Sequence, residues 1–419
     1  MTARALLATS LVVCLSAPLM AAKAHLHPFG PAATILCYHI VESPQDPRME
    51  VSRETFHQQI RYLALTGYNV IPLRWAYEYA KGERESLPKN AVVVTIDDGW
   101  RSTYTEVFPE MQKRKFPFTV FIYPKIIGQT THALTWKQVK EMAAAGVDIE
   151  SHSLSHPFLT QRRHASLGDK QYQAWLDHEL VDSKRILERE TGRTVSFLAY
   201  PYGDYDHHLA AAVAKAGYSA ALTCDYGHVG RGSDLLRMKR FVVDKRMDFA
   251  EFRHYLGAGQ MRIEEATPIP GQVVEPEHQP LIVSARIPSY RQLDPDSVGM
   301  TILGASAMTP FAYDARDGLI SMVVRDAVNA LKGQYQRALV WGIDTKTGKR
   351  VEASWTFRIP DPASILPEIP GEIEPSVVAP GSSEPAQPKV GRQARQTAVA
   401  AAAASNDPPR VRLQPRAPK

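Results

Sequence analysis

Short apolar, β-branched runs alternate with helical patterns from about residue 33 to residue 255. The apolar runs predict strands at 33–39, 91–96, 118–123, 147–150, 195–200, 219–223 and 241–243. The 3.6-residue spacing of hydrophobic positions predicts helices between several of them, at 52–67, 136–145, 172–190 and 207–216. Repeated strand–helix units predict a parallel sheet, and this many units favours a barrel. We therefore expect an α/β fold, a distorted (β/α)7 barrel over residues 25–260.

The hydrophobic pattern changes after the barrel. Residues 261–280 contain four prolines that interrupt any regular element, which predicts a linker. Residues 281–360 hold short alternating runs separated by turn residues, which predicts a small immunoglobulin-like β-sandwich. Residues 361–419 are rich in Pro, Ala, Ser and Arg and almost free of aromatic residues, so we expect a disordered tail.

The N-terminal end has the pattern of an export signal. Arg4 precedes an apolar stretch from 5 to 19, and Ala22-Lys23-Ala24 offers a cleavage site with small residues. This predicts a signal peptide at 1–24 and an exported protein, in the periplasm, in the cell envelope or outside the cell.

The net charge of +5 comes from the C-terminal tail. Residues 382–419 contain seven basic and two acidic side chains, and seven minus two is +5, so the rest of the chain sums to zero. The barrel and sandwich therefore have no basic excess that would indicate nucleic acid as a partner. The tail could associate with an anionic cell wall or envelope, or could simply be solvated.

Two cysteines remain after the signal peptide, Cys37 and Cys224. Export would permit a disulfide, but both lie in or beside apolar runs, which favours buried free thiols. With no Cys-x-x-Cys pair, a zinc–thiolate site is not indicated.

Polar residues with catalytic potential follow four of the predicted strands. His39 ends the first strand, Asp97-Asp98 the second, His152 the fourth, and Pro201-Tyr202-Gly203 the fifth. The carboxyl ends of barrel strands lie on one face, where catalytic groups collect. These residues are therefore expected to converge.

Asp98, His152 and His156 have the composition of a catalytic metal site. Two imidazoles and one carboxylate hold a divalent ion and leave positions open for water and substrate. In an extended backbone Asp97 points away from Asp98, so Asp97 is cast as the base that takes the proton of water. Taken alone, Asp-Asp-Gly is usually a turn and His-x-x-x-His a helix surface. Non-haem iron oxygenases share the ligand set, but usually on an antiparallel scaffold.

The sequence resembles the polysaccharide deacetylases of carbohydrate esterase family 4. The first and second motifs of that family match 93–99 (Val-Val-Thr-Ile-Asp-Asp-Gly) and 151–157 (Ser-His-Ser-Leu-Ser-His-Pro), and 197–203 (Phe-Leu-Ala-Tyr-Pro-Tyr-Gly) resembles the third. The resemblance covers about residues 33–255. It implies Asp97 as base and Asp98, His152 and His156 as ligands of a divalent metal, Zn²⁺ first, with Co²⁺ or Ni²⁺ as alternatives.

The same resemblance implies three further roles. The backbone N–H of Tyr202 would stabilise an oxyanion. Many members brace the base with an arginine in the third motif, where this chain has Ala199, and the usual C-terminal histidine acid has no counterpart. Both departures resemble the secreted poly-N-acetylglucosamine deacetylases, so we hypothesise that His39 is the acid and that Arg237 replaces the brace. A satisfied core histidine and a surface ion pair are the alternatives for these two residues.

The expected function is metal-dependent removal of N-acetyl groups from a GlcNAc-containing polysaccharide, with release of acetate. An O-acetyl esterase and a non-catalytic glycan-binding matrix protein are the alternatives. Aromatic residues near the motifs could line a sugar cleft: Trp100, Tyr123, Trp136 and Tyr202. In the sandwich, Trp341 and Trp355 could contact sugar or lie in the core.

Overall fold

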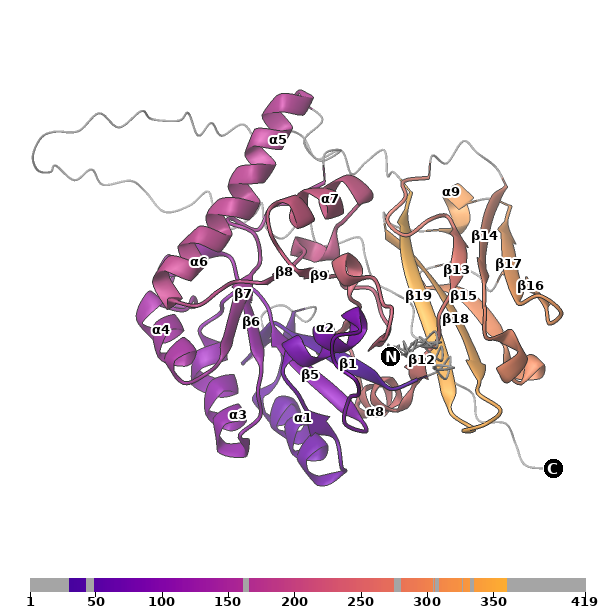
Figure 1. The fold of residues 1–419 in the computed structure, drawn as a ribbon, viewed down its shortest axis with the longest axis horizontal. Coiled ribbons are helices and arrows are strands. Elements are labelled where there is room, and N and C mark those ends of the chain that lie inside the picture. Colours follow the sequence, from indigo (N-terminus) through magenta and orange to yellow (C-terminus); the bar gives the residue numbers. More distant parts are fainter. Residues whose placement is uncertain are drawn as a thin grey trace, which may run out of the picture.

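The computed structural model describes residues 30–359, except 43–48, 161–165, 275–279, 304, 306–308, 326 and 332–334. The predicted signal peptide (1–24) and tail (361–419) lie outside the described residues. Figure 1 shows two bodies side by side, a larger one of mixed helix and strand and a smaller one of strands.

A curled, mostly parallel sheet forms the larger body. Its strands are β1 (Ala32–Tyr38), β4 (Asn69–Val70), β5 (Ala91–Ile96), β6 (Thr119–Ile122), β7 (Asp148–Ser151), β8 (Phe197–Ala199), β9 (Ala220–Leu222), β10 (Val229–Gly230) and β11 (Phe241–Val242). The order is β10-β1-β5-β6-β7-β8-β9, with β11 parallel to β1 and β4 parallel to β5. A bridge between Met238, just before β11, and Leu222 of β9 brings the two sides of the curl together. The parallel strand–helix architecture predicted from the hydrophobic pattern is confirmed.

Helices cover the outer face of this sheet (Figure 1). The α-helices of the larger body are α1 (Arg53–Leu65), α2 (Leu73–Lys81), α3 (Phe108–Arg114), α4 (Trp136–Ala144), α5 (Asp169–Asp177), α6 (Ser183–Thr191), α7 (His207–Lys215) and α8 (Phe249–Gly257). Shorter turns are η1 (Thr103–Val107), η2 (Pro124–Ile126), η4 (His178–Asp182), η5 (Pro201–Gly203) and η6 (Leu235–Arg237), and β2 (Ile40–Val41) pairs with β3 (Glu50–Val51).

Both faces of the parallel sheet are buried, which explains why its strands have continuous apolar runs. On β1, Leu36 belongs to a core shared with α1 and α3 to α8, whereas Ile35 belongs to a separate core that includes α2. The two cores fix the sheet between helices, so its strand ends are held in place for the loops that follow them.

The smaller body consists of two four-stranded sheets around one hydrophobic core. One sheet has the order β12-β19-β18-β15 and the other β13-β14-β17-β16. Their strands are β12 (Gly259–Gln260), β13 (Glu264–Thr267), β14 (Leu281–Arg286), β15 (Gly299–Leu303), β16 (Phe311–Asp314), β17 (Leu319–Val324), β18 (Tyr335–Ile343) and β19 (Arg350–Arg358), with α9 (Ala327–Ala330), η7 (Tyr290–Gln292) and η8 (Pro295–Ser297) between them. The two-sheet arrangement agrees with the predicted sandwich, and its immunoglobulin-like topology stays a prediction.

The stretch predicted as a linker contributes to the smaller body. Within 261–280, β13 pairs antiparallel with β14, and Val273 bridges to Arg358. The interpretation failed because Pro268 and Pro270 follow β13 and do not interrupt it, which leaves Glu264–Thr267 free to pair.

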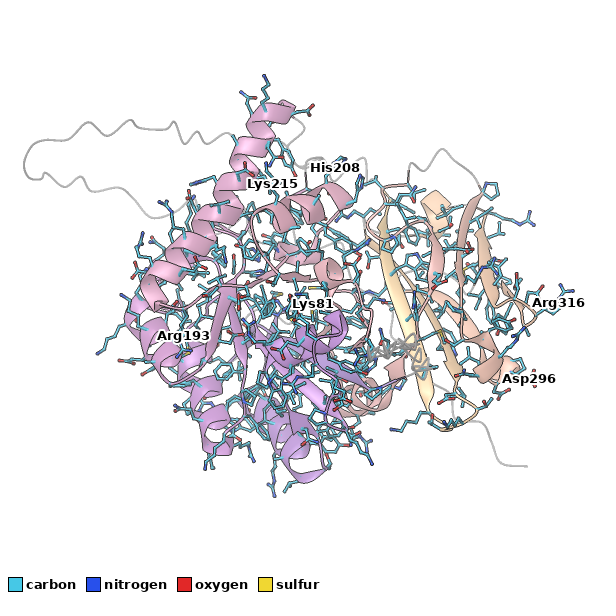
Figure 2. All side chains as sticks on the ribbon, in the orientation of Figure 1. Lys81, Arg193, His208, Lys215, Asp296 and Arg316 are labelled. Atoms are coloured by element: carbon cyan, nitrogen blue, oxygen red, sulfur yellow. The ribbon has the colours of Figure 1, made fainter. Side chains whose placement is uncertain are left out.

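Charged side chains are spread over the outside of both bodies (Figure 2). Arg193 lies at the far side of the larger body, whereas Arg316 and Asp296 lie at the opposite end of the smaller one (Figure 2). Among the helices within the described ranges, none has the length and apolar composition needed to cross a membrane.

Candidate metal and catalytic site

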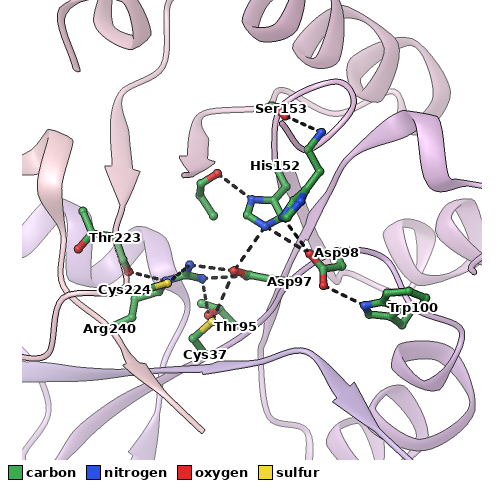
Figure 3. Close-up of polar contacts among 12 residues, drawn as sticks. Cys37, Thr95, Asp97, Asp98, Trp100, His152, Ser153, Thr223, Cys224 and Arg240 are labelled. Carbon is green, nitrogen blue, oxygen red and sulfur yellow. Dashed lines mark hydrogen bonds and ion pairs between the residues drawn. The ribbon is translucent and has the colours of Figure 1, made fainter. Parts of the chain in front are cut away.

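Asp97, Asp98 and His152 lie close together in the structure (Figure 3). Asp97 and Asp98 follow β5 directly, and His152 follows β7. His39 follows β1, and Tyr202 lies in η5, which begins two residues after β8. One edge of the curled sheet therefore carries all of these groups, because parallel strands present their carboxyl ends on the same side.

Asp98, His152 and His156 form a compact set of metal-type donors. The Nε2 atoms of His152 and His156 each lie 3.4 Å from Oδ1 of Asp98. That oxygen is buried and has no hydrogen-bond partner among the described residues. A buried carboxylate oxygen without a partner is costly, and two imidazole nitrogens around it form the donor set of a catalytic zinc-type site. The residues present fit a divalent cation.

Neighbouring groups orient two of these donors. Nδ1 of His152 lies 2.7 Å from the carbonyl oxygen of Ala199. A carbonyl only accepts, so the neutral ring carries its proton on Nδ1 and leaves Nε2 free as a donor to a metal. The second oxygen of Asp98 accepts a hydrogen bond of 2.9 Å from the indole of Trp100.

The loop from His152 to His156 is a tight turn, so the two histidines do not lie on a helix surface. Ser153 and His156 have φ values of 63° and 61°, in the left-handed region that most residues avoid. Glu179, buried in η4, accepts hydrogen bonds from the backbone N–H groups of Leu154 and Ser155, at 3.0 and 2.9 Å. These bonds stabilise the strained turn that brings both imidazoles to Asp98.

The electrostatics of the donor set separate the two histidines. Burial, together with the charge of neighbouring His152, lowers the pKa of His156 to about 4. Burial would also lower the pKa of His152, but the carboxylates of Asp98 and Asp97 raise it above its ordinary value. Asp98 is buried too, yet the contact of its carboxylate with His152 and the charge of the other nearby imidazoles hold its pKa far below the ordinary range. An ionised Asp98 beside a neutral His156 is the protonation state that metal binding requires.

Asp97 is held by a buried arginine that the sequence interpretation missed. Nη1 and Nη2 of Arg240 each donate a hydrogen bond of 2.8 Å, one to each carboxylate oxygen of Asp97 (Figure 3). Both side chains are buried. The same guanidinium donates to the carbonyl oxygen of Thr223, at 3.0 Å. Such a two-pronged contact fixes both the position and the orientation of a carboxylate.

The prediction that Arg237 braces Asp97 is wrong. Arg237 lies in η6, forms an ion pair of 2.6 Å with Asp234, and is 36% exposed. Arg240 takes the bracing position because it stands immediately before β11, whose pairing with β1 brings it beside the end of β5. A charged residue directly before a buried apolar run was the signal that could have identified it. Glu179 was missed because an acidic residue within a long helix has no distinguishing pattern.

The charge of Arg240 determines the state of Asp97. Burial alone would raise the pKa of Asp97, but the guanidinium, with help from His152, holds it below its ordinary value. Asp97 is therefore ionised at neutral pH. The thiol of Cys37 donates to its Oδ2 at 3.5 Å, and burial raises the pKa of this thiol well above its ordinary value.

The two cysteines are free thiols, as the sequence favoured. Cys37 is buried on β1, and Cys224 is partly buried after β9, with its sulfur 4.0 Å from Nη2 of Arg240. They lie near the Asp97–Arg240 pair.

His39 is buried beside the same carboxylate. A ring nitrogen of His39, Sγ of Cys37 and a carboxylate oxygen of Asp97 lie within 4.8 Å of one another. The side chain is 7% exposed, and its Nδ1 has no hydrogen-bond partner within the described part of the chain. It is therefore not the fully satisfied core histidine considered as the alternative.

Tyr202 lies at the mouth of the site with its ring exposed. Its φ of 61° turns the chain sharply, and the ring stacks on Phe158 with centroids 4.0 Å apart and meets the edge of His156 at 4.6 Å. Gly203 follows at φ 66°, and a Cβ there would lie 2.9 Å from the backbone nitrogen of Cys224. Only glycine permits this close approach of the loops after β8 and β9.

The other aromatic residues divide between the site and the core. Tyr123 packs 5.0 Å from the ring of His156, and Trp100 is bonded to Asp98. Trp136 packs against the core that the sheet shares with α1 and α3 to α8. Trp355 is buried in the sandwich core, whereas the guanidinium of Arg350 lies over the ring of Trp341. Tyr123 and Tyr202 are thus the two of these aromatic residues whose rings contact His156.

Comparisons with known proteins find a matching family model and several similar proteins. Residues 84–221 match the family model described as polysaccharide deacetylase. YxkH of Bacillus subtilis, a protein named as a polysaccharide deacetylase by similarity, is 29% identical over 222 residues. The match covers 53% of this chain and 75% of that protein. The poly-β-1,6-N-acetyl-D-glucosamine N-deacetylase of Staphylococcus epidermidis is 27% identical over 198 residues, covering 46% of this chain and 68% of its own. Among solved structures, IcaB from Ammonifex degensii is 25% identical with a TM-score of 0.49, covering 55% of this chain and 98% of that one.

The fold and the donor set define a β/α domain with a curled, half-barrel sheet and a two-histidine, one-carboxylate site at the carboxyl ends of its strands. Residues 84–221 match the polysaccharide deacetylase model, and the chain is similar to polysaccharide N-deacetylases, which are hydrolases that act on amide bonds.

Proposed function

We propose that this protein is an exported, metal-dependent N-deacetylase that releases acetate from a GlcNAc-containing polysaccharide. The observation that carries the proposal is the pairing of two units at one strand edge: the Asp98–His152–His156 donor set and the ionised base Asp97, held by Arg240. The name of the staphylococcal relative supports the substrate class.

The donor set would hold a divalent ion, for which Zn²⁺ is our first choice and Co²⁺ or Ni²⁺ the alternatives. When bound, such an ion supplies Lewis-acid polarisation of the acetamide carbonyl and lowers the pKa of water. Oδ1 of Asp98 and the Nε2 atoms of both histidines would be its ligands.

The chain's own residues provide the proton transfers. Asp97 accepts the proton of the attacking water, and its ionised state at neutral pH makes it available for that step. Attack on the carbonyl carbon builds negative charge on oxygen, toward which the backbone N–H of Tyr202 would donate a hydrogen bond.

His39 would complete the reaction as general acid. A proton from its ring passes to the amide nitrogen as the C–N bond breaks, which gives a free amine on the sugar and acetate. The burial of His39 beside Asp97, with an unpartnered Nδ1, supports this role. Ester substrates need less protonation of the leaving group, so a buried acid favours amides over O-acetyl esters.

Acetate release tests the proposal. The full chain, with and without chelator, is incubated with β-1,6- and β-1,4-linked N-acetylglucosamine oligomers and with acetylated xylan, and Asp97→Asn is the inactive control. We expect acetate from an N-acetylglucosamine oligomer, lost with chelator and restored by Zn²⁺. Acetate from xylan alone would point to an O-acetyl esterase. Sugar binding without acetate from any substrate would point to a non-catalytic glycan-binding protein.

Export and cell-wall association form the outer part of the proposal. The sequence pattern of residues 1–24 supports export, and the basic excess of residues 382–419 supports contact with an anionic envelope. Fractionation of cells that express the chain with and without residues 361–419 tests both claims. A chain that stays in the cytoplasm would reject export, and an unchanged envelope fraction after truncation would reject a role for the tail.

A further inference from the structure

One face of strand β19, in the smaller body, contacts the loops that surround the candidate site. On β19, the side chains of Ser354, Thr356 and Arg358 alternate with core residues and all contact the barrel. Their partners lie after β8 and β9, the strands whose loops carry Tyr202 and approach Asp97 through Arg240. The interface between the two bodies is thus part of the surroundings of the site.

Arg358 contacts the loop that follows β8. It is 2% exposed, forms an ion pair with Asp204, and donates a hydrogen bond of 2.8 Å to the carbonyl oxygen of Tyr205. Asp204 is completely buried and follows Tyr202-Gly203 directly. The sandwich arginine therefore fixes the backbone just beyond the proposed oxyanion donor.

Asp204 also connects Arg358 to the loop that carries His156. Its Oδ2 accepts a hydrogen bond of 2.6 Å from the hydroxyl of Thr160, which is buried and lies four residues after His156. One buried carboxylate thus joins three segments: the loop of Tyr202, the loop of His156, and strand β19.

A second set of contacts reaches the loop behind Asp97. Nη2 of Arg337, on β18, donates to the carbonyl oxygen of Cys224 at 2.9 Å, and the hydroxyl of Thr356 binds the carboxylate of Asp225. The backbone N–H of Arg240 donates to the carbonyl oxygen of Asp225 at 3.0 Å. The sandwich is therefore connected to the brace of the base as well.

We propose that the sandwich domain is an integral positioning element of the active site, in which Arg358 holds Asp204 so that the Tyr202 and His156 loops keep their working geometry. The proposal rests on the proposed function of the barrel site. Arg358 is a positioning residue, since it acts through Asp204 and Tyr205. Side chains that orient such groups typically contribute 10–100-fold to metal affinity or activity.

A charge-balanced double variant separates positioning from simple stability. Arg358→Met alone leaves Asp204 buried without its partner, which lowers stability whatever the role of the pair. Arg358→Met with Asp204→Asn removes both charges and keeps an acceptor for Thr160, so stability returns. The matched control is Arg316→Met with Asp314→Asn, the same changes in an exposed sandwich pair of 2.6 Å, far from the barrel (Figure 2).

The measurements are Tm, the Kd for Zn²⁺ and the kcat for acetate release. We expect the Arg358/Asp204 double variant to recover the Tm of the control while kcat stays at least ~10-fold lower and the zinc Kd at least ~10-fold higher. Arg358→Lys keeps the charge but cannot reach Asp204 and Tyr205 with the geometry of a guanidinium, so it should show the same loss of kcat with a near-normal Tm. Arg358→Lys also provides the test if the double variant does not fold.

Recovery of kcat and zinc Kd together with Tm, to the values of the control, would overturn the proposal. If the unaltered chain releases no acetate from any oligomer, the proposed function has failed. The zinc Kd then still decides whether Arg358 positions the His156 loop, because metal binding needs no turnover.

Discussion

Replacing Arg240 by Met tests how strongly the base depends on its brace. The change removes two charge-assisted hydrogen bonds of 2.8 Å to a carboxylate that is 1% exposed. Hydrogen bonds to charged groups contribute about 1.5–3 kcal/mol each, and breaking one side of a buried ion pair costs about 3–5 kcal/mol. The range for breaking an ion pair already includes the cost of leaving Asp97 unpaired. We therefore expect Arg240→Met to lower the free energy of unfolding by about 3–5 kcal/mol.

This loss is large enough to measure by thermal unfolding. At about 2–4 °C per kcal/mol for a domain of this size, Tm should fall by roughly 6–20 °C. Arg237→Met is the matched control, three residues away in the chain. Its exposed pair with Asp234 should contribute at most about 1 kcal/mol to stability, so its Tm should fall by no more than about 4 °C.

The same variant should move the pH dependence of activity. Asp97 must be ionised to accept a proton, and Arg240 holds its pKa below the ordinary value. Without Arg240, burial dominates and the pKa rises, so the acidic limb of kcat/KM should shift to higher pH. The carboxylate's depressed pKa also contributes stability above the unfolded-state pKa that is lost as pH falls through the folded-state pKa. The Tm gap between the unaltered chain and Arg240→Met should therefore be widest near neutral pH and shrink in acid.

The assays are Tm and kcat/KM, each measured from acid to neutral pH at fixed Zn²⁺ concentration. An Arg240→Met protein with the Tm of Arg237→Met and an unmoved acidic limb would refute the reasoning that Arg240 sets the state of Asp97.

Three other perturbations address the remaining groups. Glu179→Met should raise the Kd for Zn²⁺ by about 10–100-fold, measured with a metal indicator, because the turn that carries His156 loses its acceptor; an unchanged Kd would count against that support. His39→Gln should lower kcat on the N-acetyl substrate by about 10²–10⁴-fold but much less on an activated acetate ester, and equal losses on both would argue against an acid role. Tyr202→Ala should raise KM for oligomers more than it lowers kcat, because the exposed ring is lost while the backbone N–H stays; a fall in kcat alone would disagree.

Much of the barrel and the donor set followed from the sequence because both depend on local patterns. Fully buried parallel strands leave continuous apolar runs, and the residues after them must share one edge, so the positions of Asp98, His152 and His156 along the chain were enough to group them. The short strands β4 and β10 have two residues each, too few to leave a period that can be recognised.

The supports of the site were harder to predict because they depend on contacts between distant segments. Arg240 stands directly before an apolar run and Arg237 does not, but the contact with Asp97 itself depends on the pairing of β11 with β1. Similarly, Arg358 reaches Asp204 across 154 positions of the chain, since 358 minus 204 is 154. No hydrophobic period records such a contact.

The close approach of Gly203 to Cys224 has a consequence for engineering the substrate range. A side chain at position 203 would collide with the backbone of the neighbouring loop, so neither loop can be reshaped alone. Residues 200–205 and 223–226 therefore form the smallest unit that could be exchanged between relatives. If one loop is grafted without the other, the two backbones no longer fit at positions 203 and 224. A complete graft would also have to include the sandwich residues that bind both loops, Arg337, Thr356 and Arg358.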